Sequence, residues 1–478
     1  MAKKSSPHHG RTSKSPAPKG SEGSRSSPSV GVVGLGFVGV AMAVAFAHYG
    51  RQVWGFDVSA PRLRDIREGR APFYDPGLQE ELEAAVSSGR LRVAPDRAHL
   101  LKESEVVFLC LPTPSRADGS VDVSFLEAEA ERLGKLLPDV GAWRLVVVKS
   151  TSPPGTCEHV RDLLAGSSGL VPGKDFSVAC NPEFLAEGSL VRDALEPSRI
   201  VLGVADARGE KALRNAYDGF PSSRVVLPPT SAELVKYASN ALLAVKVSFA
   251  NEIARVAEAA GADVYPVLEA VGLDPRLGAA FLKAGPGFGG SCFPKDLKGL
   301  VAFARQAGTP LPVTEGALAV NETQARHVVD LAEGAVGGRL AGRVVALLGL
   351  AFKAGTDDVR ESRAFPILGE LLKRGAEVQI HDPRALASFE AALPQLLSQA
   401  MGDRVRASPT VRSAIAGADL AILQCDWPEY REVAPSLWRQ LREHLVVDAR
   451  RSVDPSALRA AGVRYVAVGL SPSAGPRP

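Results

Sequence analysis

The stretch from residue 29 to residue 57 constrains the fold of this chain more than any other feature of the sequence. It reads as a short β-branched run, a glycine turn, an alanine-rich helical run and a second short apolar run that ends at Asp57. The glycines of the turn are spaced GxGxxG. A strand, this turn, a helix and a strand ending in an acid form the first unit of a doubly wound parallel sheet.

This unit predicts a dinucleotide cofactor. Gly34 allows a tight turn, Gly36 lets the backbone approach a pyrophosphate, and Gly39 lets the helix and strand pack closely. The helix N-terminus then offers amide donors to phosphate. Asp57 lies about 20 residues beyond the turn, where a carboxylate accepts a hydrogen bond from a ribose 2′-hydroxyl, so NAD is favoured over NADP. Arg62 follows closely and keeps NADP open, and a glycine turn in another α/β unit is the plain alternative.

Three further apolar runs continue the pattern, over residues 105–114, 144–156 and 176–188. Each ends in polar, proline or glycine residues, as buried parallel strands do. The carboxyl ends of such strands open on a ligand crevice, so the polar side chains that follow are expected at one functional edge. These side chains are Thr113, Thr151, Glu183 and Glu187.

A long helix is predicted from Thr230, because residues 230–260 contain neither proline nor glycine. Thr230 and Glu233 have the spacing of a capping box. Lys236 and Asn240 are four residues apart and share one face, although a solvated lysine is the plain alternative for Lys236. Apolar residues recur at helical spacing, which predicts a largely buried connector between domains. The recurring residues are Leu234, Ala238, Leu242, Val245, Phe249, Ile253 and Val256.

A second α/β unit begins near residue 341. Its first turn, residues 349–353, lacks the second and third glycines of the fingerprint, so no second dinucleotide is expected. Lys353 and Arg360 instead suggest a phosphate-bearing ligand held by charge, with ordinary surface salt bridges as the alternative. The sequence therefore predicts an α/β protein in which a central long-helix region joins two doubly wound, Rossmann-like domains.

Composition limits the class of protein further. The chain has 478 residues, 45% hydrophobic, which is enough for more than one core. Its formal net charge of +3 favours neither nucleic acid nor a membrane as partner. No run of about 18 apolar residues could span a bilayer, and the N-terminus has no apolar segment of a signal peptide. Five scattered cysteines without a CxxC pair argue against a disulfide framework or a structural zinc site and fit a reducing cytoplasm.

The N-terminal 28 residues hold six Lys or Arg against one Glu, with Ser, Pro and Gly between them. This composition predicts a disordered basic tail. The expected organisation is the tail at 1–28, an NAD-binding domain at 29–220, a central helical region at 221–330 and a second α/β domain at 331–470.

The segment GFGGSCFPKD, residues 287–296, places a thiol on a glycine-rich backbone just before a lysine and a carboxylate. An NAD-type domain implies hydride transfer. Oxidising an aldehyde to an acid also needs a tetrahedral hydride donor, which a thiolate forms by attacking the carbonyl, and Cys292 suits this role. Lys236 and Lys295 are cations of the kind that ionise a thiol, and Asp296 could relay a proton. The alternatives for Cys292 are a buried small hydrophobe and a redox sensor.

With these residues in place, the chain resembles a known family, the nucleotide-sugar 6-dehydrogenases of the UDP-glucose/GDP-mannose dehydrogenase group. The resemblance covers residues 30–455 and follows one order along the chain. Besides the acid Asp57, its segments are GLGFVG, PFYDPGL, LPTP, KSTSPPGT, NPEFLAEGS, ELVKYASNALLAVKVSFANE, GFGGSCFPKD, LLGLAFKAGTDDVRES and VVDARR.

The resemblance implies a four-electron oxidation of a sugar C6 alcohol to a carboxylate, with two NAD reduced per sugar. Cys292 would be the nucleophile that carries a thioester. Lys236 would stabilise oxyanions or assist the first proton removal, and Asn240 would orient the reacting oxygen. Asp296 would act as a base with a bound water, and Glu183 would be the candidate base for thioester hydrolysis.

The resemblance implies that 221–330 is the dimerisation region with the catalytic loop and that 331–470 is the nucleotide-sugar-binding domain. It also implies which residues contact the ligands. Thr151 and Glu187 match positions at the cofactor and the catalytic water. Arg276 matches a residue that reaches the substrate of a neighbouring subunit, which implies at least a homodimer. The implied cofactor contacts are Gly34, Gly36, Phe37, Val38, Gly39, Asp57, Arg62, Thr113, Thr151, Glu187, Lys295 and Arg360. The implied substrate contacts are Glu183, Phe184, Leu185, Lys236, Asn240, Arg276, Phe281, Leu282, Lys283, Ala284, Gly285, Gly289, Lys353 and Arg450.

Substrate choice within the family follows from two short segments. SCFPKD preceded by DPRLG resembles the UDP-glucose branch. GDP-mannose and UDP-N-acetylhexosamines remain as alternative substrates. A nucleotide-binding interaction protein without catalysis is the non-enzymatic alternative, and no metal ion is expected.

Overall fold

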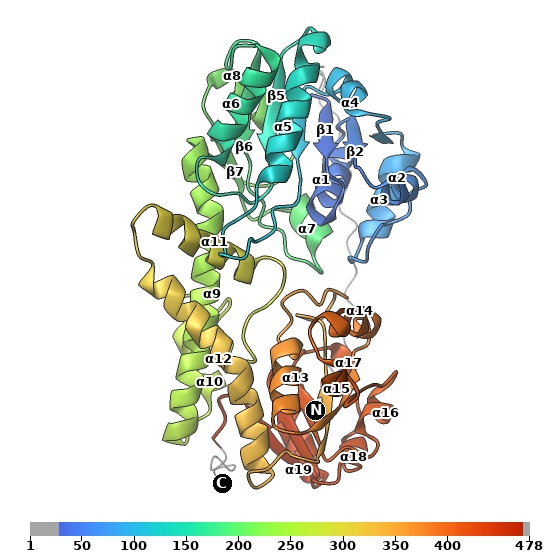
Figure 1. Ribbon diagram of the computed structural model, residues 1–478, viewed down its shortest axis with the longest axis vertical. Coiled ribbons are helices and arrows are strands. Elements are labelled where there is room, and N and C mark those ends of the chain that lie inside the picture. The colour runs from blue at the N-terminus through green and yellow to red at the C-terminus, as the bar shows by residue number, and fades with distance from the viewer. Residues whose placement is uncertain (1–27, 472–478) are drawn as a thin grey trace, which may run out of the picture.

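The computed structural model describes residues 28–471, in which two α/β domains are joined by one long helix (Figure 1). The predicted tail at 1–28 lies outside the described residues except for Pro28. None of the helices in residues 28–471 is both long enough and apolar enough to cross a bilayer. The predicted fold class, with two doubly wound sheets and a long helix between them, is confirmed.

The N-terminal domain is built on a sheet of eight described strands in the order β3-β2-β1-β4-β5-β6-β7-β8. Neighbouring strands are parallel except for β6 and β7, which are antiparallel. The strands are β1 Val30–Val33, β2 Val53–Phe56, β3 Leu91–Val93, β4 Val106–Leu109, β5 Arg144–Val148, β6 Phe176–Cys180, β7 Ile200–Val204 and β8 Arg224–Leu227. The helices are α1 Phe37–His48, α2 Ala60–Arg67, α3 Leu78–Ser87, α4 Arg97–Glu103, α5 Ser124–Leu136, α6 Thr156–Ser168, α7 Leu190–Leu195 and α8 Ala207–Ala216.

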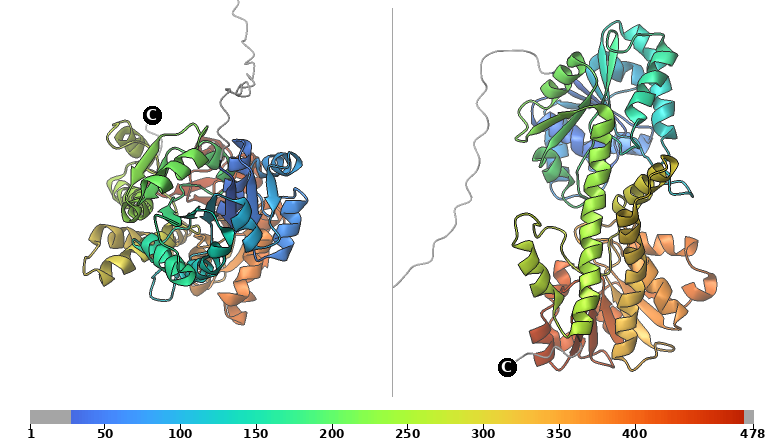
Figure 2. Two further views of the ribbon diagram at one scale, coloured as in Figure 1. Left: turned by 90° about the horizontal axis from the view of Figure 1, so that it is seen from above. Right: turned by 90° about the vertical axis from the view of Figure 1, so that its left-hand side faces the viewer.

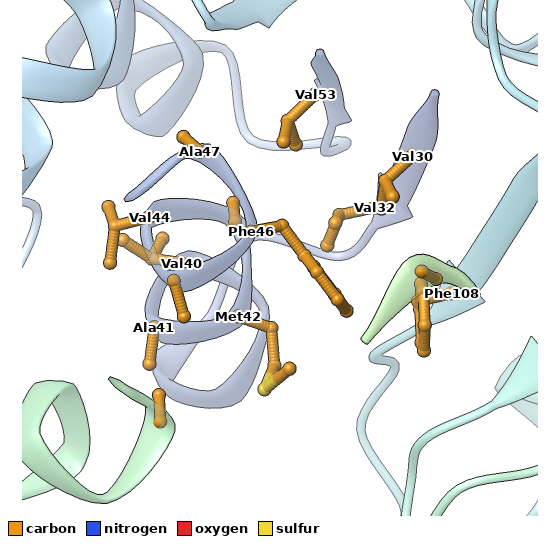
Figure 3. Packing of buried hydrophobic residues seen from close by; sticks show 14 of the residues in the cluster. Val30, Val32, Val40, Ala41, Met42, Val44, Phe46, Ala47, Val53 and Phe108 are labelled. Atoms are coloured by element: carbon orange, nitrogen blue, oxygen red, sulfur yellow. The ribbon is translucent and has the colours of Figure 1, made fainter. Parts of the chain in front are cut away.

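Helices cover both faces of this sheet, which explains its continuous apolar strands. Val30 and Val32 of β1 pack with α1, α7 and α8, whereas Val33 belongs to the core on the opposite face with α4, α5 and α6. Figure 3 shows Phe46 of α1 directed at the sheet, where its ring lies 4.9 Å from that of Phe108. The carboxyl ends of the parallel strands are therefore the open edge of the domain.

The C-terminal domain repeats this plan with six described strands, all parallel, in the order β11-β10-β9-β12-β13-β14. One face packs against α9, α12 and α13 and the other against α16, α18 and α19. The strands are β9 Val344–Leu348, β10 Glu377–His381, β11 Val405–Ala407, β12 Leu420–Leu423, β13 Leu445–Asp448 and β14 Arg464–Ala467. The helices are α13 Ala364–Lys373, α14 Leu386–Ala392, α15 Gln399–Gly402, α16 Val411–Ile415, α17 Pro428–Arg431, α18 Pro435–Trp438 and α19 Pro455–Ala460.

Helix α9 runs from the first domain along the side of the second (Figures 1 and 2). The predicted capping box at its start is wrong. The helix begins one residue earlier, after Pro228, and Glu233 instead accepts hydrogen bonds from the backbone N–H groups of Gly155 (2.6 Å) and Cys157 (2.7 Å). Glu233 thus binds the N-terminus of α6, where a carboxylate is favoured. The other helices of this region are α10 Val264–Gly272, α11 Phe293–Gln306 and α12 Pro312–Ala335, with α9 itself Pro229–Ala260.

The predicted burial of the large apolar stripe on α9 is also wrong. Leu242 is 63% exposed and Val256 61%, and Leu234 and Phe249 are exposed as well. The helix instead buries the face that carries Ala232, Ala244, Ala250 and Ala254, because small residues let α9 lie close against both domains and the neighbouring helices. Lys236 and Asn240 lie on this buried face.

Candidate active site

The glycine turn after β1 leaves open space at one position. Gly34 has φ +90°, and a Cβ there would lie 2.3 Å from the Cys110 carbonyl oxygen, so close packing requires glycine. A Cβ at Gly39 would lie 1.8 Å from the Gly34 carbonyl oxygen. A Cβ at Gly36 would meet nothing within 4 Å, and this space adjoins the N-terminus of α1. The turn therefore fits the pyrophosphate of a dinucleotide.

Asp57 holds this turn in place and also faces Arg62. Its carboxylate accepts hydrogen bonds from the backbone N–H groups of Leu35 (2.7 Å) and Ser59 (2.8 Å). Arg62 Nη1 lies 3.0 Å from the same carboxylate. The positive charge that would attract a 2′-phosphate is therefore already paired, which favours the NAD assignment over NADP.

A buried ion pair joins α9 to the loop after β6. Lys236 Nζ lies 2.8 Å from Glu183 Oε1, and both side chains are at most 6% exposed. Burial alone would raise the pKa of Glu183, but the Lys236 ammonium, the Leu185 N–H and Lys149 together lower it below its usual value. Burial would lower the pKa of Lys236, but Glu183, Cys292 and Asp296 together raise it. Both groups are therefore charged at neutral pH.

A second polar contact joins α9 to α11. Asn240 Nδ2 donates to Asp296 Oδ2 at 2.6 Å, and both residues are buried. Lys295 Nζ lies 2.7 Å from the other oxygen of the Asp296 carboxylate. Asp296 belongs to the first turn of α11, directly below Cys292 at the N-cap, whose carbonyl accepts the Asp296 N–H. The four sequence-predicted residues Lys236, Asn240, Cys292 and Asp296 thus lie in one cluster.

Cys292 is a protonated thiol in the free protein. Burial raises its pKa to about 11, Glu183 raises it too, and Lys236 acts in the opposite direction. Ser291 Oγ lies 3.6 Å from Cys292 Sγ. The position at the N-terminus of α11 favours a thiolate once a base removes the proton.

Glu187 connects the two domains next to this thiol. Ser291 Oγ donates to Glu187 Oε1 at 2.8 Å, and Arg360 of the C-terminal domain donates to the same oxygen at 2.9 Å. Burial, and to a smaller extent Asp358, raise the pKa of Glu187 to about 7. Arg360 also lies over the ring of Phe37, which directly follows Gly36, with its guanidinium carbon 5.3 Å from the ring centre. Arg360 is therefore placed between the glycine turn and the cysteine loop.

The loop from residue 284 to residue 290 is fixed by buried amides that the sequence reasoning missed. Asn321 of α12 accepts from the Phe288 N–H (2.7 Å) and donates to the Phe288 carbonyl (3.1 Å). Gln324 donates to the Gly285 carbonyl (2.8 Å), and Asn251 accepts from the Gly285 N–H (2.8 Å). Asn321 and Gln324 are three residues apart and therefore share one helix face. Amide side chains on an otherwise apolar helix face indicate buried hydrogen bonds, and this pattern could have identified them from the sequence.

The other predicted substrate contacts lie either between residues 276 and 289 or in the C-terminal domain. Arg450 reaches the Gly287 carbonyl at 3.4 Å, and a Cβ at Gly289 would lie 2.2 Å from the Glu361 carbonyl oxygen, so this loop packs tightly on the C-terminal domain. Lys353 is half-buried, and burial lowers its pKa while the nearby Glu187 acts in the opposite direction. Among the predicted substrate contacts between residues 276 and 285, the exposed ones are Arg276, Phe281 and Lys283, and the buried ones are Leu282, Ala284 and Gly285.

The remaining strand-end residues lie in the loops that follow β4, β5 and β6. Thr113 Oγ1 donates to the Thr151 carbonyl at 2.8 Å, which ties the loops after β4 and β5 together. The Leu185 N–H donates to Glu183 Oε2 at 2.6 Å, and the ring of Phe184 lies 5.8 Å from Lys236 Nζ. Val38 is part of the first turn of α1. Across residues 28–471, no group of three or more His, Cys, Asp and Glu side chains is arranged to hold a metal ion.

Comparison with protein families gives matches in all three parts of the chain. Residues 28–221 match the NAD binding domain of the UDP-glucose/GDP-mannose dehydrogenase family, residues 230–323 its central domain, and residues 346–455 its UDP binding domain. These matches cover well over half of the sequence.

Individual relatives agree with the family match. A UDP-glucose 6-dehydrogenase of Bacillus subtilis is 35% identical over 94% of this chain and 95% of its own length. One of Pseudomonas aeruginosa is 37% identical over 92% of this chain and 96% of its own. The solved structure of a UDP-glucose dehydrogenase from Pyrobaculum islandicum has a TM-score of 0.85 and 41% identity, and covers 94% of this chain and 99% of that chain.

The raised pKa of Cys292 predicts how the thiol reacts with iodoacetamide. Only the thiolate reacts, so below a pKa of about 11 the labelling rate should rise with pH and level off only near that value. Because the Lys236 ammonium lowers the thiol pKa, Lys236→Met should raise it further and slow labelling at a given pH. The rate is measured on the Cys292 peptide by mass spectrometry.

Lys298→Met, which removes an exposed lysine of the same α11 helix, is the matched control and should label as the parent protein does. A plateau near pH 8, or faster labelling of Lys236→Met, would contradict the assigned environment of the thiol.

Proposed function

Because the chain belongs to the UDP-glucose/GDP-mannose dehydrogenase family, we propose that it oxidises the C6 alcohol of UDP-glucose to the carboxylate of UDP-glucuronate and reduces two NAD per sugar. The observation that carries this proposal is the enclosure of one thiol, Cys292, by a buried lysine, amide and two carboxylates. An alcohol oxidation alone needs only a base, whereas a thiol is needed for the second oxidation.

In the first oxidation, the C6 hydroxyl loses a proton and a hydride. Asp296 takes the proton through a bound water, and Asn240, whose amide already contacts Asp296 at 2.6 Å, orients the reacting oxygen. The Lys236 ammonium stabilises the oxygen as negative charge develops on it, and its low exposure strengthens that effect.

In the second oxidation, the Cys292 sulfur adds to the C6 aldehyde and forms a thiohemiacetal. The thiol proton leaves toward Asp296, the carboxylate of the same helical turn. Loss of a hydride from C6 then gives a thioester on Cys292. Lys236 faces the oxygen of both intermediates.

The last step is hydrolysis of the thioester. Water adds to the thioester carbon, Glu183 accepts the water proton, and the carbon–sulfur bond breaks to release the acid and the thiol. The lowered pKa of Glu183 means that this residue is a carboxylate at neutral pH and can accept a proton. Its ion pair with Lys236 holds it at the reacting carbon.

NAD supplies the hydride acceptor for both oxidations when it is bound. The open position at Gly36, the N-terminus of α1 and the Asp57 carboxylate fit its pyrophosphate and ribose. Arg360 and Glu187 fit the other end of the cofactor, since both lie between the glycine turn and Cys292. On the substrate side, Lys353 and Arg450 supply positive charge for the diphosphate.

We also propose that the chain forms a homodimer through α9. The exposed stripe on α9 is apolar along its length, and Leu273, Leu277 and Phe281 in the segment after α10 are further exposed apolar side chains. Exposed apolar surface of this extent marks protein interfaces. Lys246 of α9 donates to the carbonyls of Leu277 (3.2 Å) and Gly278 (3.0 Å), which holds the segment with Arg276 beside the stripe. An exposed Arg276 there can reach a second copy of the chain. A reducing cytoplasm suits the free thiol of Cys292 and is the proposed location.

Stoichiometry tests the proposed reaction. With excess NAD, UDP-glucose should yield two NADH per sugar, measured by absorbance, and GDP-mannose and UDP-N-acetylglucosamine should yield little or none. Cys292→Ala should lose product formation entirely, because no thioester can form. Ser436→Ala, at an exposed site in the C-terminal domain, is the control. One NADH per UDP-glucose, or full turnover by Cys292→Ala, would refute the mechanism.

Charge on the α9 stripe tests the dimer. Leu242→Glu combined with Phe249→Glu should halve the mass found by sedimentation, because two carboxylates cannot be buried in an apolar interface without large cost. Leu396→Glu places the same charge on an exposed leucine of the C-terminal domain and should leave the mass unchanged. A monomeric parent protein, or a folded double variant of unchanged mass, would contradict the proposal.

A further inference from the structure

A pocket of about 220 Å³ lies behind the loop that carries Glu183. It is bounded by α1 through Met42, by α7 through Ala194, and by the segment 196–199 that leads into β7. Glu196 and Ser198 are exposed, so solvent enters at this end. The volume holds several water molecules, since water occupies roughly 30 Å³ in the liquid.

The inner wall of the pocket is polar and buried. Lys149 Nζ donates to Asn181 Oδ1 at 2.8 Å and to the Tyr217 hydroxyl at 3.3 Å, and Asn181 donates to the Val201 carbonyl at 2.7 Å. Two of the three Lys149 donors are thus held by protein, and the third can bind water. Burial lowers the pKa of Lys149 to about 8. Buried polar groups of this kind bind water.

The pocket meets the reacting centre at a single catalytic group. Glu183 lines it, whereas Cys292, Lys236, Asn240 and Asp296 do not. The Glu183 carboxylate also contacts Lys236, and both groups act on the Cys292 thiol. Glu183 therefore belongs both to the wall of the pocket and to the group of charges around the cysteine.

This arrangement matters at the last step of the proposed reaction. While the thioester exists, the sugar is covalently attached to Cys292 and the cofactor occupies the adjoining site, so the two ligands shield the cysteine from solvent on their side. The hydrolytic water must reach the thioester carbon from another direction. The solvated pocket ends at the residue that would accept its proton.

We propose that this pocket delivers the water that hydrolyses the Cys292 thioester. The inference rests on the proposed function. The water oxygen bonds to the thioester carbon, one water proton passes to Glu183, and the carbon–sulfur bond breaks. The sulfur takes up a proton to restore the thiol, the acid product ionises, and the released protons return to solvent through the waters of the pocket.

Filling the pocket tests this inference. Ala194→Leu adds a larger side chain at the wall, and Ser198→Trp covers the exposed rim. Ser198→Trp is a surface change that tests the same route if Ala194→Leu does not fold. Each variant is mixed rapidly with UDP-glucose and saturating NAD, and NADH is followed by absorbance. Ala207→Leu makes the same substitution at an exposed site on α8, outside the pocket, and is the matched control.

The expected result is a fast phase of two NADH per subunit at the parent rate, followed by turnover slower by about tenfold or more, because only hydrolysis is blocked. Parent-like turnover in both folded pocket variants would overturn the inference. Equal slowing of the fast phase and of turnover would overturn it too, because the pocket would then affect an earlier step. Failure of the parent protein itself to form two NADH per sugar would instead refute the proposed function.

Discussion

The buried ion pair of Lys236 and Glu183 is the interaction on which this site depends. It joins the helix that spans the molecule to the loop at the open edge of the NAD-domain sheet, with 2.8 Å between the charged atoms. Removing one partner of such a pair leaves an uncompensated buried charge and costs roughly 3–5 kcal/mol. The same pair keeps a cation and a carboxylate charged next to Cys292. Stability and chemistry therefore depend on one contact.

The rest of the architecture brings ligands from two domains to this contact. Each doubly wound sheet ends in a polar edge, and the loop with Cys292 lies between the two edges. Arg360 connects the C-terminal domain to Glu187, and Arg450 connects it to the loop at Gly287. The amides of α12 and α9 fix the same loop from behind. A change in the relative position of the domains would thus be transmitted directly to the cysteine.

Local sequence patterns were enough to predict the fold and the core of the site. Contacts between residues far apart in the sequence could not be predicted from such patterns. The glycine turn and the spacing of Lys236 and Asn240 depend on nearby residues, so the sequence was sufficient for both. Helical periodicity identified the apolar stripe of α9, but it does not say which face of the helix is buried. In the structure the face with small residues is buried and the stripe is exposed. Glu233 has a local capping pattern, yet its partners lie 76 and 78 residues away. The two hydrogen bonds between Asn321 and Phe288 could not be predicted either, because they form only when α12 is folded against the loop.

The central claim is that the sugar becomes covalently attached to Cys292 during turnover. The most direct measurement is the intact mass of the protein, acid-quenched within the first turnover after mixing with NAD and UDP-glucose, followed by peptide mapping. The account predicts an added mass equal to UDP-glucuronate less one water, confined to the peptide of residues 287–296. Product formation with an unmodified Cys292 at every time point would contradict it.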